Sequence, residues 1–177
     1  MADTASSRIR VNRAACPSPH SSANKVARLL WQAVWLLLFR PSPWFWHAPR
    51  RALLRLFGAQ VGRGAQIMPS AKIWAPWNLA LGDCATVGAG VDVYSVGRIE
   101  IGAHATVSQR AFLCTATHDV DHPNMPLVVA PVKIGAGAWV CAEAYVHPGV
   151  EIGTDAVAGV RAAVLHDVPP GQIVGGN

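Results

Sequence analysis

The sequence is short of charged residues. They make up 14% of the 177 residues, whereas hydrophobic residues make up 51%. So few charges leave little polar surface for a soluble monomer, which predicts that part of the surface is covered by oligomerisation or by a membrane. The length fits a single domain with a sizeable core.

The sequence also lacks paired cysteines. No two of the four cysteines form a Cys-x-x-Cys pair, so neither a zinc knuckle nor a redox motif is indicated. Cys84, Cys114 and Cys141 lie in a region of repeats, where we expect small apolar core residues in a reducing compartment.

Acidic residues are scarce in the first third of the chain. Residues 1–60 contain nine Lys or Arg and one acid, Asp3, for a net charge of +8. Residues 61–177 contain six basic and nine acidic residues, for a net charge of −3. The basic character therefore belongs to an N-terminal arm, which suits anionic lipid or nucleic acid. Nucleic acid is the weaker alternative, because Trp44 and Trp46 lie in apolar rather than polar company.

A long hydrophobic run is missing as well. The apolar stretch from Leu29 to Phe39 has 11 residues and is interrupted by Gln32. A helix rises ~1.5 Å per residue, so this stretch is too short to cross a bilayer core of ~30 Å. Pro41 and Pro43 follow where a signal peptide would carry small residues for cleavage, which disfavours that alternative.

The N-terminal sixty residues divide into two parts. We expect residues 1–24 to be a disordered basic segment and residues 25–60 to be an apolar, amphipathic helical arm, with a second helix at about 48–57 that ends at Gly58. Aromatic residues at 44–46 beside two arginines are typical of a membrane interface. The sequence leaves open whether the arm lies on a membrane or packs on the protein's own body.

From Val61 onward, aliphatic residues recur every six positions. The longest such run is Ile134, Val140, Val146, Ile152, Ala158 and Val164. Glycine often follows the aliphatic residue, and alanine often stands four places after it. Neither a helix nor an alternating strand has period six. The pattern predicts triangular coils of three short strands, with the aliphatic residue inside and glycine permitting the turn, stacked ~4.8 Å apart as a parallel β-helix.

These hexads, with "HDVPPGQIVGGN" at 166–177, resemble the hexapeptide-repeat acyltransferases, whose fold is a left-handed β-helix. The segments "LLRLFGAQVG", "WAPWNLALGD" and "LCTATHD" extend the likeness, over about residues 26–177, to the colanic-acid-type polysaccharide acetyltransferases. The resemblance implies a mainly β fold in which a left-handed β-helix at 61–177 carries the helical arm and one external loop. Family members usually continue past Gly-Asn with Pro-Ala and a short basic tail, so further chain is expected beyond Asn177.

The resemblance also implies a function. The family transfers an acetyl group from acetyl-CoA to a sugar hydroxyl, without a metal, and the members are homotrimers. We therefore expect a saccharide acceptor in exopolysaccharide biosynthesis, either free or lipid-linked. The expected location is the cytoplasm, where the arm would contact the inner face of the membrane if it binds lipid.

The repeat breaks between Leu113 and Ile134, which are 21 residues apart rather than a multiple of six. This segment must leave the coil as an external loop, and such an interruption indicates a functional role. In the family, a loop near this point carries a histidine into a cleft between subunits, and His118 in "TATHD" occupies that place. The resemblance implies that His118 is the general base, a role that suits a neutral imidazole with a pKa near ~6.5. The alternative is an ordinary exposed histidine.

Further site residues are expected around His118. Asp119 could orient the imidazole, bind the sugar or simply form a turn. Asp92, which departs from its hexad, is a candidate for acceptor binding. By resemblance alone, acetyl-CoA would contact Trp139, Ala142, Val160, Leu165 and His166. Ala142 and Leu165 replace hydroxyl residues of the family, and His166 replaces a lysine, so side-chain bonds to the cofactor would be lost at these positions.

Two other classes of function compete with acetyl transfer. A γ-carbonic-anhydrase-like metal enzyme has the same fold, and "HDVDH" at 118–122 contains zinc ligand types. However, both histidines lie in one loop. A non-catalytic β-helix scaffold would need neither His118 nor Trp139.

Overall fold

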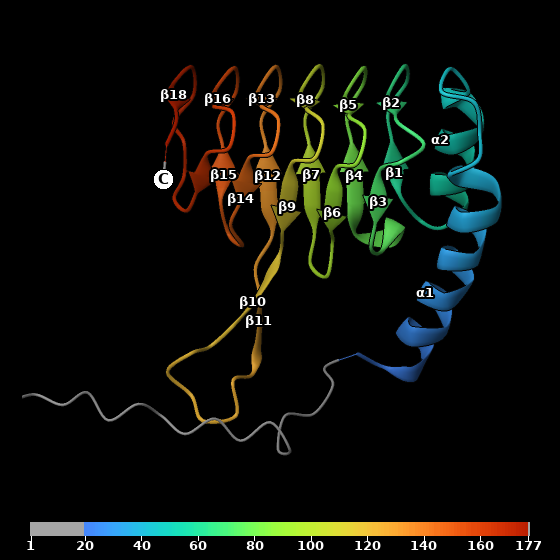
Figure 1. Ribbon diagram of the computed structural model, residues 1–177, viewed down its shortest axis with the longest axis horizontal. Helices are drawn as coiled ribbons and strands as arrows, with labels where there is room; N and C mark the ends of the chain where they lie inside the picture. Colours follow the sequence, from blue (N-terminus) through green and yellow to red (C-terminus); the bar gives the residue numbers. More distant parts are fainter. Residues whose placement is uncertain (1–19, 177) are drawn as a thin grey trace, which may run out of the picture.

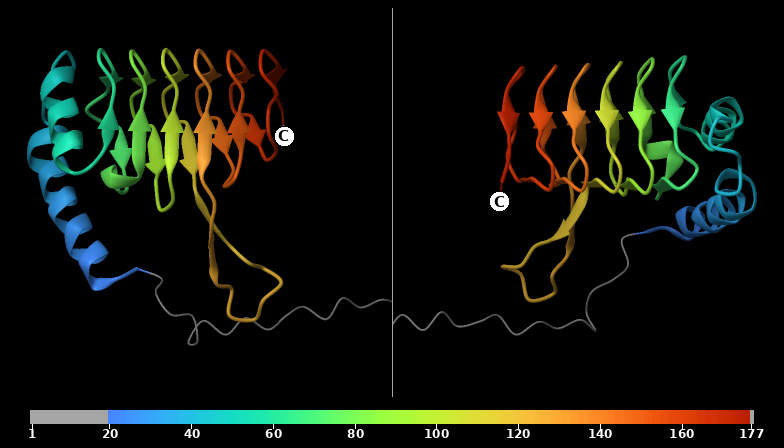
Figure 2. Two further views of the ribbon diagram at one scale, coloured as in Figure 1. Left: turned by 180° about the vertical axis from the view of Figure 1, so that it is seen from behind. Right: turned by 45° about the horizontal axis from the view of Figure 1, so that its top comes forward.

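A computed structural model describes residues 20–176 of the chain (Figure 1). The chain winds into coils that stack side by side into a parallel β-helix, with helices covering the N-terminal end of the stack and a hairpin projecting from its side (Figures 1 and 2). The predicted fold class is therefore confirmed.

The coils present three flat faces, each a parallel sheet. Face A consists of β1 (Gln60–Val61), β4 (Leu79–Leu81), β7 (Ile99–Ile101), β12 (Val132–Ile134) and β15 (Glu151–Ile152). Face B consists of β2 (Gln66–Ile67), β5 (Thr86–Val87), β8 (Thr106–Val107), β13 (Trp139–Val140), β16 (Val157–Ala158) and β18 (Ile173–Val174). Face C consists of β3 (Lys72–Ile73), β6 (Asp92–Tyr94), β9 (Phe112–Cys114), β14 (Tyr145–Val146) and β17 (Ala163–Val164).

The hexad pattern is confirmed by burial and register. The aliphatic residue of each hexad lies inside and stacks on its equivalent in the next coil, as Val87 does on Val107 and Val107 on Val140. The alanine four places later is also buried; Ala105 and Ala138, for example, are fully inaccessible. Each aliphatic and alanine thus contributes to one continuous core.

The glycine of the hexad was expected to permit the turn, but the structure gives it another role. A Cβ added to Gly102 would lie 2.5 Å from the backbone nitrogen of Ala136 in the next coil, and Gly135 is equally close to Thr154. These glycines allow neighbouring coils to approach. The left-handed turn positions are instead often occupied by residues with a side chain, among them Arg110 and Arg161.

The cysteines only partly follow the prediction. Cys114 is buried in the core region and Cys141 is half-buried. Cys84 is exposed, because it occupies one of the left-handed turn positions, with φ of 57°. Cys16 lies outside the described residues.

The helical arm covers the first coil. It consists of α1 (Ser22–Val34), a π-helical continuation η2 (Trp35–Phe39) and α2 (His47–Leu56), while a short 3-10 turn, η3 (Pro76–Asn78), lies between β3 and β4. Trp31, Phe39 and Leu54 are buried in the main core. Helix α1 begins three residues before the expected start of the arm, and most of the segment 1–24 expected to be disordered lies outside the described residues.

The arm also satisfies the hydrogen bonds of the exposed edge of the first coil. The indole nitrogens of Trp31 and Trp35 donate to the carbonyl oxygens of Ile73 and Ala71 at 2.7 and 2.8 Å. Such an edge would otherwise present unpaired carbonyls. The inner side of the arm therefore packs on the β-helix, which was one of the two alternatives left open by the sequence.

Three arginines of the arm also donate hydrogen bonds to the edge of the first coil. The guanidinium groups of Arg50, Arg51 and Arg55 donate to backbone carbonyls of the first coil. Arg50 is completely buried. The charge of Arg50 is therefore not available to a membrane surface, and Arg51 and Arg55 are tied to the first coil by hydrogen bonds, contrary to the expectation from composition.

Candidate active site

The predicted external loop is confirmed and forms an antiparallel hairpin. Strands β10 (Ala116–His118) and β11 (Leu127–Val129) pair with each other, while β12 returns to the stack and pairs directly with β7. The hydroxyl of Thr115 fixes the base of the hairpin, since it accepts from the Gly97 amide at 2.9 Å and donates to the Tyr94 carbonyl at 2.6 Å. Figure 1 shows the hairpin projecting well clear of the coils.

His118 lies at the end of β10 and is exposed. Its Nδ1 is 2.7 Å from the carbonyl oxygen of Met125 on the returning arm of the hairpin. A carbonyl can only accept a hydrogen bond, so Nδ1 carries the proton of the neutral ring and Nε2 keeps the lone pair. The hairpin therefore presents His118 in the tautomer that a general base requires.

Asp119 does not orient the imidazole; the carbonyl of Met125 has that role. One carboxylate oxygen of Asp119 accepts from the backbone amide of Asp121 at 3.0 Å, which is the turn-forming alternative. Sugar binding by Asp119 stays a prediction.

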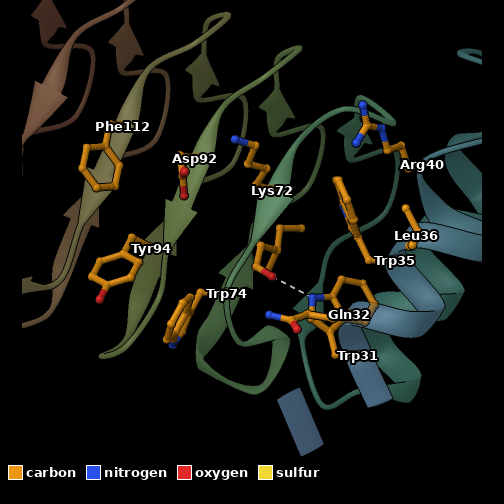
Figure 3. Close-up of a pocket in the computed structure, with 11 residues that line it drawn as sticks. Trp31, Gln32, Trp35, Leu36, Arg40, Lys72, Trp74, Asp92, Tyr94 and Phe112 are labelled. Carbon is orange, nitrogen blue, oxygen red and sulfur yellow. Dashed lines mark hydrogen bonds between the residues drawn. The ribbon is translucent and has the colours of Figure 1, made fainter. Parts of the chain in front are cut away.

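A cleft of about 690 Å³ lies between the arm and face C (Figure 3). Trp35, Trp74, Tyr94 and Phe112 contribute aromatic rings to its lining. The rings of Trp74 and Tyr94 meet edge to face at 4.9 Å, and Phe112 follows 6.1 Å beyond Tyr94. The cleft thus has an aromatic wall that runs across three successive coils.

The polar residues of the cleft are Gln32, Arg40, Lys72 and Asp92. Asp92 stands opposite Lys72 in the register of β3 and β6. Desolvation raises the pKa of the Asp92 carboxyl, and the charge of Lys72 partly opposes this effect. A half-buried carboxylate beside aromatic rings can bind hydroxyl groups, and the structure thus places Asp92 in a candidate acceptor site.

The cleft and the hairpin adjoin along the chain. Phe112 of the cleft lies in β9, which leads through Thr115 into β10 and His118. Both the hairpin and α1 project from the same side of the β-helix (Figure 1). Among the cleft residues, only Asp92 was a candidate from sequence. The aromatic wall could have been found in the sequence from large residues that recur 20 positions apart and face outward, such as Trp74 and Tyr94.

The residues expected at acetyl-CoA fall into two groups. Trp139, Ala142 and Val160 lie on adjacent coils, where the Arg161 amide donates to the Ala142 carbonyl at 3.0 Å. Trp139 is 49% exposed and Val160 65%, and the indole nitrogen of Trp139 donates to the Ser108 hydroxyl at 2.8 Å. Leu165 and His166 lie at the following corner, beyond β17, in a separate small hollow.

Metal-ligating side chains do not converge on a common point anywhere in residues 20–176. In particular, Asp121 and His122 are exposed and engaged in local turns of the hairpin. The metal-enzyme alternative therefore gains no support from the structure.

Comparisons with known proteins agree with the fold. No family model matches the chain. The colanic acid biosynthesis acetyltransferase WcaF of Escherichia coli K12 is 40% identical over 161 residues, which cover 91% of this chain and 88% of that protein. The crystal structure of a maltose O-acetyltransferase from Clostridium difficile 630 superposes with a TM-score of 0.80 at 23% identity, covering 89% of this chain and 85% of that one. The hexapeptide-repeat acetyltransferase VCA0836 of Vibrio cholerae, solved with acetyl-CoA, also gives 0.80 at 23% identity, covering 90% and 87%.

Proposed function

Since the chain belongs to the hexapeptide-repeat acetyltransferases, we propose that it transfers an acetyl group from acetyl-CoA to a hydroxyl of a saccharide in exopolysaccharide biosynthesis. The observation that carries this proposal is the hairpin, which holds His118 in the basic tautomer on a strand that continues from Phe112 of the aromatic cleft. WcaF, by its name, works in colanic acid biosynthesis, and the aromatic lining with Asp92 suits a sugar acceptor.

The mechanism follows from the state of His118. Nε2 accepts the proton of the acceptor hydroxyl as the oxygen attacks the thioester carbonyl, and no acyl-enzyme forms. His118 then returns the proton to the departing thiolate. The carbonyl of Met125 holds the ring throughout and stabilises the imidazolium that forms in between. General-base catalysis of this kind contributes typically about 10²–10⁴-fold to the rate.

Acetyl-CoA fits the exposed strip around Trp139 and Val160. These side chains stand on adjacent coils and are about half and two-thirds exposed, as expected of a surface that receives an extended pantetheine arm. The alanine at 142 offers no hydroxyl, so contacts there would involve the main chain. Leu165 and His166 would contact the cofactor further along.

We also propose that the enzyme is a homotrimer. His118 lies on a hairpin that projects from the coils, and the surface around Trp139 is exposed to solvent. A neighbouring subunit would enclose His118 and this surface in one cleft. Analytical ultracentrifugation at micromolar concentration should give the mass of three chains. A mass near that of the monomer would contradict the proposal.

The outer surface of the arm is proposed to lie on a membrane. We define the outer arm surface as Leu37, Leu38, Trp44, Phe45, Trp46 and Leu56, whose exposed fractions range from 50% to 78%. Leu37, Leu38, Trp46 and Leu56 also share one apolar groove. None of the helices in the described part of the chain is long and apolar enough to span a bilayer, so the proposed contact is peripheral, on the inner face of the membrane.

Charge and rigidity support this proposal. Residues 4–82 contain no Asp or Glu, so nothing on this part of the chain repels an anionic surface. Arg50 fixes the aromatic residues 44–46, because its guanidinium donates to the carbonyls of Pro43 and Trp44 at 2.8 and 2.6 Å. Since Arg50, Arg51 and Arg55 are engaged internally, attachment should depend chiefly on apolar burial, at about 1.5–3 kcal/mol per large side chain that becomes fully buried.

Liposome co-sedimentation tests the membrane contact. Leu37→Asp and Trp44→Asp should abolish most of the binding to anionic liposomes, whereas high salt should weaken it only partly. Ile173→Asp is a matched control, because Ile173 is 78% exposed but lies at the opposite end of the stack. Equal binding by all three variants would contradict the proposal.

The acetyl transfer itself is tested by a screen. Purified enzyme, acetyl-CoA and a panel of polysaccharide repeat units should release free thiol with at least one acceptor, and mass spectrometry should find the acetylated saccharide. Failure across repeat units with free and with lipid-linked reducing ends would contradict the proposed function.

A further inference from the structure

We propose that the cleft between the arm and face C binds the diphosphate-linked end of a lipid-anchored saccharide, with the diphosphate on Arg40 and Lys72 and the lipid along the outer arm surface. This inference rests on the proposed acetyl transfer, since it specifies the form in which the acceptor is presented. It is argued from the charges, rings and apolar continuation of the cleft.

Two cations line the cleft, and neither forms a salt bridge within residues 20–176, although Asp92 lies next to Lys72. Arg40 lies at the end of η2, with its guanidinium carbon 5.4 Å from the centre of the Trp35 ring, and Lys72 lies in β3. A guanidinium from the arm and an ammonium from face C, both lining one cleft, suit a phosphate or diphosphate group.

The groups are ordered along the cleft. In Figure 3, Arg40 and Lys72 lie toward the arm, Asp92 lies next, and Tyr94 and Phe112 lie farthest from the arm. Aromatic rings and a carboxylate suit a sugar, which offers C–H groups to the rings and hydroxyls to the carboxylate. A saccharide bound with its diphosphate at the arm would therefore extend toward β9, the strand that leads to His118.

The cleft continues into apolar surface at the arm. Leu36 lines the cleft, and Leu37 and Leu38, the next two residues of η2, belong to the outer arm surface. These three leucines are 58%, 69% and 57% exposed. A chain attached to the diphosphate can thus pass from the cleft along these leucines onto the surface that we propose lies against the bilayer.

The test is a direct binding measurement without acetyl-CoA. Isothermal titration calorimetry with geranyl diphosphate should show binding to the full chain, and geraniol, inorganic pyrophosphate and UDP should each bind at least about tenfold more weakly. Arg40→Gln and Lys72→Gln should each weaken geranyl diphosphate by about tenfold or more. Arg63→Gln is the matched control, because Arg63 is 94% exposed and pairs only weakly with Asp83 at 3.7 Å.

The results of this binding measurement can be distinguished from those of the acetylation screen. Because Arg40 and Lys72 are exposed, the variants should melt at the temperature of the wild type. Binding that is unchanged in both variants would overturn the inference, as would pyrophosphate or UDP binding as tightly as geranyl diphosphate. Neither result requires turnover, so each leaves the proposed acetyl transfer to be judged by thiol release.

Discussion

Arg50 should be the most costly single arginine to remove from this protein. Its side chain is fully buried, and the hydrogen bonds of its guanidinium reach the Ile67 carbonyl at 2.7 Å, the Ser42 hydroxyl at 2.6 Å and the carbonyls of Pro43 and Trp44. It thus joins the loop at 42–44 to the edge of the first coil. Arg50→Met keeps the apolar stem of the side chain but removes every hydrogen-bond donor. We expect this variant to weaken the attachment of the loop and of α2 to the first coil.

The size of the effect follows from the acceptors left behind. A buried acceptor that loses its partner costs about 1–3 kcal/mol. The Ile67 carbonyl keeps a longer contact with His47, at 3.2 Å, and water can reach part of the loop, which reduces the penalty at the other two carbonyls. We therefore expect a loss of about 3 kcal/mol in the free energy of unfolding, the sum of these reduced penalties.

Urea unfolding followed by far-ultraviolet circular dichroism measures this loss at a fixed protein concentration. Arg51→Met is the control, because Arg51 is only half-buried and donates a hydrogen bond to the Ala65 carbonyl at 2.9 Å. Its loss should cost about 1 kcal/mol. If Arg50→Met costs no more than Arg51→Met, the account of how the arm is fixed to the first coil is wrong.

Three further predictions concern the coils and the two binding surfaces. Gly102→Ala should lower the melting temperature sharply, at a cost of about 1–3 kcal/mol or more, because its Cβ would lie 2.5 Å from Ala136, whereas Gly175→Ala meets nothing within 4 Å and should be neutral. Asp92→Asn should raise the melting temperature at pH 7 and weaken acceptor binding, seen as a higher KM. Its raised pKa means that the wild type loses stability, relative to this variant, as pH rises above the ordinary value of ~3.9. Trp139→Ala should raise the KM for acetyl-CoA with little change in kcat.

The coils could be predicted because each hexad repeats the same physical requirement. Val107 and Val140 must fill the same interior as their neighbours, and a period of six exposes that requirement directly in the sequence. The break after Leu113 was visible for the same reason, since 21 residues do not fit a whole number of hexads. His118 was therefore placed on a projecting element without any structural information.

The contacts between distant segments could not be predicted in this way. Arg50 and Arg51 are adjacent in the sequence and looked equivalent, yet Arg50 is buried and Arg51 is not, because only the fold decides which carbonyls each can reach. The partner of His118 is likewise a backbone carbonyl, at Met125, and carries no signal in residue type. The cleft depends on where the arm lies relative to face C, so Trp35 of η2 and Lys72 of β3 could not be brought together from the sequence.

The central claim is that His118 is the base for acetyl transfer from acetyl-CoA. The most direct test is the steady-state rate of thiol release by His118→Ala, measured together with its affinity for coenzyme A. His122→Ala, another exposed histidine of the same hairpin, is the matched control. The account predicts that His118→Ala lowers kcat by about 10²-fold or more at nearly unchanged coenzyme A affinity, while His122→Ala stays close to wild type. A His118→Ala variant with near-normal kcat would contradict it.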